Sequence, residues 1–172
     1  GRLCSVFRLK TEPINKLPVI LTDDTERQHM HNFILKSRPL SYNSCRGTKK
    51  TNYKSAIETS FTTYNPTHTL LNGDLYATIY YFFNKNLDLD TDNLSKPVWD
   101  CLNGFLFNDD QQIKIRIAGS FDLTTGDYSV IDLSGLQGNL VVDLLDAFEN
   151  EEHIVYVECG KFKPSMYKFN IE

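Results

Sequence analysis

The chain has 172 residues, 41% of them hydrophobic and none in a long uncharged apolar run, which fits one domain with a sizeable core and excludes a membrane-spanning helix. The formal net charge is −4 and unevenly spread: residues 1–60 carry +6, residues 61–118 carry −3 and residues 119–172 carry −7. The first ten residues do not resemble a secretory signal, and the four widely spaced cysteines form no CxxC pair. We therefore expect a protein of the reducing cytoplasm without a zinc site or disulfide frame.

Residues 1–30 are interpreted as an N-terminal extension, and the chain after them begins a domain that runs from 31 to 172. Its first apolar segment, 33–35, predicts a strand. A basic stretch follows, which contains Arg38, Arg46, Lys49, Lys50 and Lys54 around a loop at Asn43. Such a run is most often a solvated surface, but it can also follow a DNA backbone. We expect DNA contact at Asn43, Arg46, Lys49, Lys50 and Lys54.

The segment 75–83 (LYATIYYFF) is rich in aromatic and β-branched residues and follows an Asn-Gly turn pair, so it predicts a second strand. The chain then enters an acidic group, DLDTD, at residues 88–92. If that group is extended, alternation places Asp88, Asp90 and Asp92 on one side of the chain.

An amphipathic helix is expected next, because apolar residues recur at helical spacing from Leu94 to Phe105. Asp92 or Asn93 can cap its start, and Asn103-Gly104 provides its C-terminal stop. Pro97 is tolerable only close to the start of the helix, because proline lacks a backbone N–H. On the polar face, Lys96 and Asp100 are four residues apart and can form an ion pair.

A second acidic group, Asn108-Asp109-Asp110, forms a turn before a strand in which Ile113, Ile115 and Ile117 alternate with polar residues. We expect the helix to pack between neighbouring strands and to bring Asp90, Asp92 and Lys96 together with Asp109 or Asp110. Crowded carboxylates repel one another and form a hard-oxygen ligand set that suits Mg²⁺ or Mn²⁺. Taken alone, each acidic pair is also typical of a solvated turn or a helix start.

The last third is turn-rich up to Gly138 and then has an apolar stripe at helical spacing between Leu140 and Phe148. This predicts an extra C-terminal amphipathic helix, packed on the core or at a dimer interface, with the core favoured. A final strand is expected at residues 153–159.

The acidic region resembles the RusA-type Holliday junction resolvases. It carries the pattern DxDN-L-x-K-P-x-x-D-x-L-N-G from Asp90 to Gly104, followed by DD-x-Q-I from Asp109 to Ile113. The loop Arg38 to Asn43, with the strand before it, is similar to the opening of the same family. The resemblance covers residues 33–118 and the expected final strand, and it treats about 120–150 as an insertion.

The resemblance implies an α+β fold with a small mixed sheet packed with two core helices. It implies a homodimeric, Mg²⁺-dependent endonuclease (Mn²⁺ also possible) that resolves four-way DNA junctions by symmetric paired nicks. The metal ligands of the family correspond to Asp90, Asp92 and Asp110, and its functional lysine corresponds to Lys96. Together Asp90, Asp92, Lys96 and Asp110 are the expected catalytic residues, and no membrane partner is expected.

Two alternatives remain open from the sequence. The first is the same metal-dependent chemistry on other branched DNA, because nothing in the residues encodes junction geometry. The second is a non-catalytic DNA-binding protein that retains the fold, which the net charge of −4 favours, since phosphate contacts usually require a basic protein.

Overall fold

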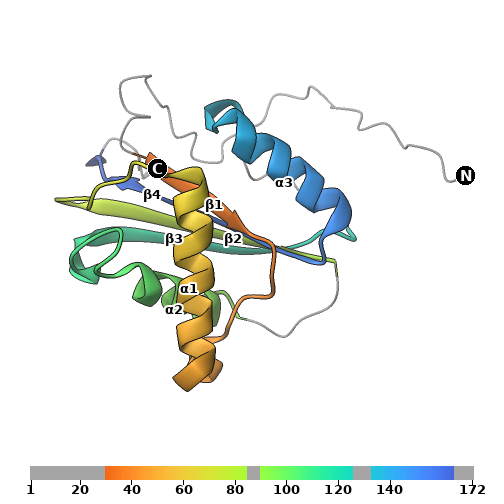
Figure 1. Cartoon of the computed structure of the whole chain (residues 1–172), viewed down its shortest axis with the longest axis horizontal. Coiled ribbons are helices and arrows are strands. Elements are labelled where there is room, and N and C mark those ends of the chain that lie inside the picture. The colour runs from red at the N-terminus through yellow and green to blue at the C-terminus, as the bar shows by residue number, and fades with distance from the viewer. Residues whose placement is uncertain (1–29, 85–89, 126–132, 165–172) are drawn as a thin grey trace, which may run out of the picture.

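The computed structural model describes residues 30–84, 90–125 and 133–164, which form one mixed sheet and three α-helices (Figure 1). The predicted α+β class is confirmed. The expected N-terminal extension lies almost wholly outside the described residues. The strands are β1 (Met30–Leu35), β2 (Leu75–Phe83), β3 (Ile113–Asp122) and β4 (His153–Lys161). The helices are α1 (Gly47–Tyr64), α2 (Thr91–Leu102) and α3 (Gly138–Asn150), with 3-10 turns η2 (Tyr42–Ser44), η3 (Asp110–Gln112) and η4 (Leu133–Gly135).

The sheet has the strand order β1-β4-β2-β3. β4 pairs antiparallel with both β1 and β2, whereas β2 and β3 run parallel from Leu75↔Ile113 to Phe83↔Asp122. A parallel pair needs a crossover that carries the chain back along the sheet, and α2 lies in that crossover. None of the helices in the described residues has the length and apolarity that crossing a membrane requires.

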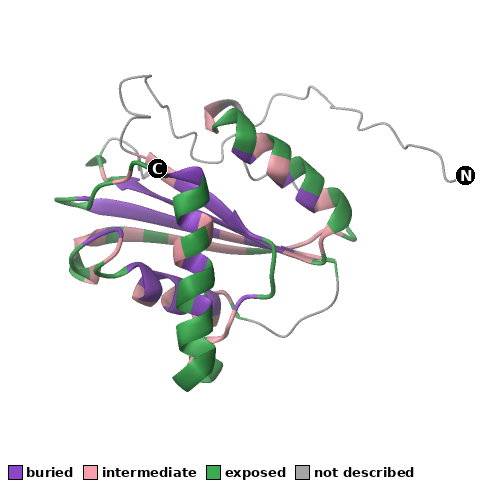
Figure 2. Ribbon diagram, in the orientation of Figure 1, coloured by how far each residue is buried: buried purple, intermediate pink, exposed green. Residues whose placement is uncertain are grey.

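The helices lie on both faces of the sheet. Phe33 of β1 contacts Phe61 of α1, and α2 packs against both α1 and β3, so α1 and α2 share one face. Phe82 of β2 points to the opposite face, because the sheet register aligns Phe33 with Ile79 and side chains alternate along a strand. There Phe82 contacts Phe148 of α3. The buried residues lie between these layers (Figure 2).

α2 follows the predicted apolar stripe, but its start differs from the prediction. Leu94, Val98 and Leu102 are fully buried, and the helix ends at Asn103 before Gly104, whose φ of 77° suits glycine. The N-cap is Asp90, so the prediction of Asp92 or Asn93 as the cap is wrong, because the helix begins earlier. The expectation that proline would lie near the start is also wrong.

Pro97 is the seventh residue of α2 and is buried. It supplies apolar contact on the covered side of the helix, although it cannot donate a hydrogen bond to the preceding turn. The helix continues through it for five more residues to Leu102. Packing of the apolar stripe therefore outweighs the local cost of the proline.

α3 confirms the expected C-terminal amphipathic helix. Leu140, Leu144 and Ala147 are fully buried, whereas Leu145, which the predicted stripe included, is half exposed. Asp143 accepts a hydrogen bond from the Tyr64 hydroxyl of α1 at 2.8 Å. These contacts place the stripe on the core rather than leaving it free for another chain.

An aromatic cluster fixes α1 on the sheet. The ring of Phe61 is fully buried and lies 4.7–5.6 Å, centroid to centroid, from His31, Phe33, His68 and Phe105. Its neighbours come from β1, from the loop after α1 and from the loop after α2. Phe61 therefore packs α1, β1 and the loops after α1 and α2 together on the face of the sheet that α1 and α2 cover.

A buried carboxylate lies in the middle of the opposite face. Glu158 of β4 accepts hydrogen bonds from the Tyr76 hydroxyl at 2.9 Å and from the Tyr156 hydroxyl. Burial raises the pKa of Glu158 above its ordinary value of 4.5, and the two hydroxyl donors only partly oppose that rise. The folded protein therefore holds a proton on Glu158 more tightly than the unfolded chain does.

We predict that Phe61→Ala lowers the free energy of unfolding by about 3–5 kcal/mol, because it leaves a cavity among four rings. Leu145→Ala should change it by less than about 0.5 kcal/mol, because that side chain is half in solvent. Urea denaturation followed by circular dichroism measures both. Equal losses in the two variants would contradict the packing of α1 described above.

Glu158→Gln should gain stability relative to the unmutated protein as pH rises from 4.5 toward neutrality. In that range the folded state binds more protons at Glu158 than the unfolded state, so rising pH destabilises only the protein that carries the glutamate. Urea denaturation of both proteins across this range gives the difference in unfolding free energy. A difference that stays constant with pH would show that Glu158 titrates alike in both states.

Candidate active site

The first acidic group lies at the start of α2. Asp90 is exposed and acts as the N-cap residue, and its Oδ2 accepts only a long hydrogen bond, 3.5 Å, from the Asn93 side chain. Asp92 is exposed in the first turn. Asp88, the third carboxylate of the predicted row, lies outside the described residues. The two that are described, Asp90 and Asp92, lie at the start of one helix. A negative charge is favourable there because of the helix dipole.

The polar face of α2 continues from this group toward its C-terminus. Asp92, Lys96 and Asp100 follow at four-residue spacing, which puts them along one side of the helix. The predicted pair is confirmed: Lys96 Nζ lies 3.4 Å from Asp100 Oδ1. The same ammonium lies 5.5 Å from the centroid of the Tyr42 ring. Lys96 is thus held between a carboxylate and an aromatic face and remains partly exposed.

The two carboxylates of the second acidic group have different roles, one within the turn and one outside it. The Asp109 carboxylate accepts a hydrogen bond from the Gln111 amide at 2.8 Å and caps η3. Asp110 makes a 3.3 Å ion pair with Arg116 of β3, and both side chains are partly exposed. Of the two carboxylates, that of Asp109 builds the turn, whereas that of Asp110 points to β3.

Gln112 has a structural role that the sequence analysis missed. Its Oε1 accepts the amides of Asn108 and Asp109 at 2.9 and 3.0 Å, and its Nε2 donates to the carbonyls of Leu71 and Gly73, both at 3.1 Å. One side chain therefore ties the turn before β3 to the loop before β2. The spacing Asp109-x-x-Gln112 is a capping-box pattern and was the available signal.

The two acidic groups lie at opposite ends of α2. Asp90 caps the start of the helix, whereas Asp110 follows its end and lies close to the start of β2 through Gln112. The thirteen residue-to-residue steps from Asp90 to Asn103 span about 20 Å along the helix axis. Within the described ranges, no three histidine, cysteine or acidic side chains come close enough to hold a metal ion. The predicted convergence of Asp90, Asp92 and Asp110 is therefore absent from this structure.

The residues at the start of α2 nevertheless suit a magnesium ion chemically. Mg²⁺ is commonly bound by one or two carboxylates, with waters and substrate phosphates completing its octahedron. Asp90 and Asp92 offer such oxygens at an exposed position with no basic side chain paired to either in the described residues. Asp110 shares its charge with Arg116 instead.

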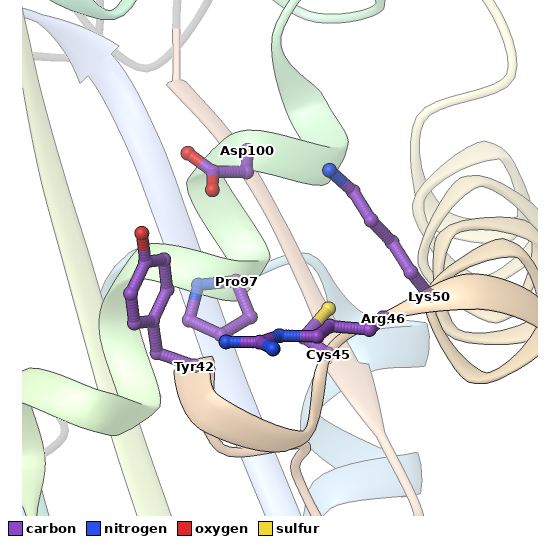
Figure 3. A pocket seen from close by; sticks show the side chains of 6 residues that line it. All are labelled: Tyr42, Cys45, Arg46, Lys50, Pro97 and Asp100. Carbon is purple, nitrogen blue, oxygen red and sulfur yellow. The ribbon is translucent and has the colours of Figure 1, made fainter.

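The basic loop borders the polar face of α2. Asn43 is exposed in η2, and Arg46 is the N-cap of α1. Side chains from this loop and from the first turn of α1 meet α2 around a pocket lined by Tyr42, Cys45, Arg46, Lys50, Pro97 and Asp100 (Figure 3). Lys49 and Lys54 are exposed but do not line it, and Lys54 pairs with Glu58 at 3.7 Å. The predicted DNA-contacting residues thus form two subsets.

The cysteines near this pocket are neutral. Burial raises the pKa of Cys45, although the nearby Lys50 ammonium opposes the rise, and burial raises the pKa of Cys101 to about 11. A thiol must lose its proton to act as a nucleophile. The candidate site therefore has oxygen ligands and cations but no reactive thiolate in the described residues.

In the comparison with protein families, the family described as Endodeoxyribonuclease RusA matches residues 37–124. The matched half of the chain contains α1, β2, α2 and β3, together with both acidic groups and the basic loop. β1, α3 and β4 lie outside it. No curated protein matches the chain.

We predict that Gln112→Ala lowers the free energy of unfolding by about 2 kcal/mol, because four hydrogen bonds of a partly buried amide are lost. Gln111→Ala is the matched control and should change it by less than about 0.5 kcal/mol, because that side chain is exposed. Chemical denaturation measures both values. If the two variants were equally stable, the proposed tie between the strand entries would be unimportant.

Proposed function

The chain belongs to the RusA endodeoxyribonuclease family, and from that premise we propose that it is a divalent-metal-dependent endonuclease that resolves four-way DNA junctions by symmetric paired nicks. The observation that carries the proposal is the polar side of α2. There, exposed Asp90 and Asp92 precede Lys96 on one helix, beside a basic loop within the matched half. The protein would act in the cytoplasm as a homodimer, because two equivalent protomers can meet equivalent strands of a nearly symmetric junction.

In the proposed site, Asp90 and Asp92 hold the metal, and Asp110 is the third carboxylate that the family pattern assigns. When bound, Mg²⁺ or Mn²⁺ supplies a Lewis acid for the phosphoryl oxygens and a water of lowered pKa. Among the described residues, neither Asp90 nor Asp92 has an ion-pair partner that it would have to give up to hold the metal. Asp110 would have to exchange its 3.3 Å contact with Arg116 to join them.

Lys96 binds the scissile phosphate or stabilises charge on the leaving oxygen. Its partners position the ammonium: Asp100 at 3.4 Å limits the reach of the side chain, and the Tyr42 ring keeps it beside the basic loop. Because the phosphate is a stronger electrostatic partner than one partly exposed carboxylate, Lys96 can turn toward the substrate while Asp100 stays four residues away on the same side of α2.

A non-catalytic DNA-binding protein is the second candidate. It is favoured by the distance between Asp110 and the start of α2, which leaves two carboxylates instead of three in one place. Nuclease activity on other branched DNA is the remaining variant of the first candidate.

We predict that Asp92→Asn lowers the rate of Mg²⁺-dependent cleavage of a synthetic four-way junction by more than about 100-fold while binding and folding are retained, because the amide is a poor ligand for a hard cation. Asp146→Asn, on α3 and outside the matched half, is the matched control and should cleave normally. The assay compares Mg²⁺, Mn²⁺ and chelator on junction, flap and linear duplex.

The outcomes separate the candidates. Paired symmetric nicks on the junction alone support the proposal, whereas cleavage of flap or duplex alone retains the nuclease and rejects the junction. Unimpaired cleavage by Asp92→Asn removes Asp92 from the mechanism. Junction binding by folded protein without any cleavage, combined with no heat of Mg²⁺ binding in calorimetry, supports the non-catalytic candidate.

A further inference from the structure

The pocket between η2, the first turn of α1 and the middle of α2 has its own chemistry. It encloses about 210 Å³, against roughly 30 Å³ for one water molecule, so it can admit a small hydrated group. Arg46 and Lys50 come from the N-cap and first turn of α1, Asp100 and Pro97 come from α2, and Tyr42 lies on the opposite side of the group from Lys50 (Figure 3). It lies beside Lys96, since Tyr42 both lines the pocket and contacts the Lys96 ammonium.

Two cations of this pocket have no ion-pair partner among the described residues. Elsewhere on this part of the chain, Lys54 pairs with Glu58, Lys96 with Asp100 and Lys114 with Asp74. Arg46 and Lys50 form no such pair, although Asp100 lines the same pocket. Because Lys96 compensates Asp100 and Cys45 is a neutral thiol, the pocket keeps an uncompensated positive charge.

The positions of Arg46 and Lys50 suit one shared anion. Arg46 is the N-cap residue of α1 and Lys50 lies in its first turn, and both line the same pocket. The first turn of α1 contains no acidic residue, and no side chain caps it. Its free backbone N–H groups and the positive end of the helix dipole add to the attraction of an anion at this end.

We propose that Arg46 and Lys50 bind a backbone phosphate of the substrate strand next to the scissile one, in the pocket walled by Tyr42 and Asp100. The inference rests on the proposed function and adds a defined subsite to it. Arg46 contributes a planar fork of donors and Lys50 a point charge, a combination suited to non-bridging phosphate oxygens. The exposed ring of Tyr42 leaves a surface on which the adjoining sugar or base can rest.

This subsite would set the register of cleavage. With one phosphate held by Arg46 and Lys50, the neighbouring phosphate meets Lys96, whose ammonium lies over the Tyr42 ring. Lys49 and Lys54, which lie outside the pocket, would contribute only general attraction to the DNA backbone. Arg46 and Lys50 are therefore positioning residues for the scissile phosphate.

The test combines charge-removing variants with charge-neutral DNA. Arg46→Gln/Lys50→Gln is compared with Lys36→Gln/Lys161→Gln, which removes the same charge from exposed positions outside the matched half. Junction affinity is measured by fluorescence anisotropy with a chelator over a series of salt concentrations. The pocket variant should bind about tenfold more weakly, and its salt slope should fall by about 1. The control should stay close to the unmutated protein.

Junctions with a single methylphosphonate then locate the phosphate. In the unmutated protein, one substitution adjoining the nick should weaken binding about tenfold, whereas the pocket variant should show no further loss at that position. Equal further losses in both proteins would mean that another part of the chain holds this phosphate. Thermal unfolding at the same temperature for all variants confirms that folding is unchanged.

The two proposals can fail separately. If the protein cuts junctions, and Arg46→Gln/Lys50→Gln binds them like the control and cuts them at the same positions, the subsite is wrong and the nuclease stands. If the pocket variant binds normally but cuts at shifted or mixed positions, the register role stands and the affinity role falls. If folded, unmutated protein binds no branched DNA, both proposals are overturned.

Discussion

The parallel pairing of β2 and β3 is the constraint on which the rest of the arrangement depends. Two neighbouring parallel strands begin at the same end of the sheet, so the chain between them must return along the length of the strands. α2 makes that return, so Asp90 at its start and Asn103 at its end lie toward opposite ends of the strands. The same pairing places the turns before β2 and β3 side by side, where Gln112 joins them.

Local patterns predicted the elements well and their meeting points less well. The aromatic and β-branched run at residues 75–83 and the apolar stripe from Leu94 predicted β2 and α2 within a few residues, because both are local sequence signals of buried elements. The expected meeting of Asp90 with Asp110 depended on the direction of α2 relative to the strands, which periodicity does not encode. Gln112 was missed because its four bonds join segments that are about 40 residues apart in the chain.

The charge distribution becomes intelligible in the folded chain. The net charge of −4 argues against DNA binding only if the acids and bases are mixed on one surface. α3, which carries Asp143 and Asp146, packs on the sheet face opposite α1 and α2. Asp143 accepts a hydrogen bond from the Tyr64 hydroxyl and Asp146 forms an exposed ion pair with Lys36, so these two acids already have partners within the chain. The bases at the start of α1 thus lie on the other side of the sheet from these acids.

Pro97 removes one backbone hydrogen bond from the middle of α2. The carbonyl of Asn93 has no amide proton to accept four residues later, so the turn that holds Asp90 and Asp92 is joined to the remainder of the helix by one hydrogen bond fewer than usual. The turns after Pro97 are clamped by the buried side chains of Val98 and Trp99. α2 therefore has a C-terminal half anchored by buried side chains and a first turn that is joined to it by one backbone hydrogen bond fewer; the two exposed carboxylates lie at that turn, and Leu94 anchors its buried side.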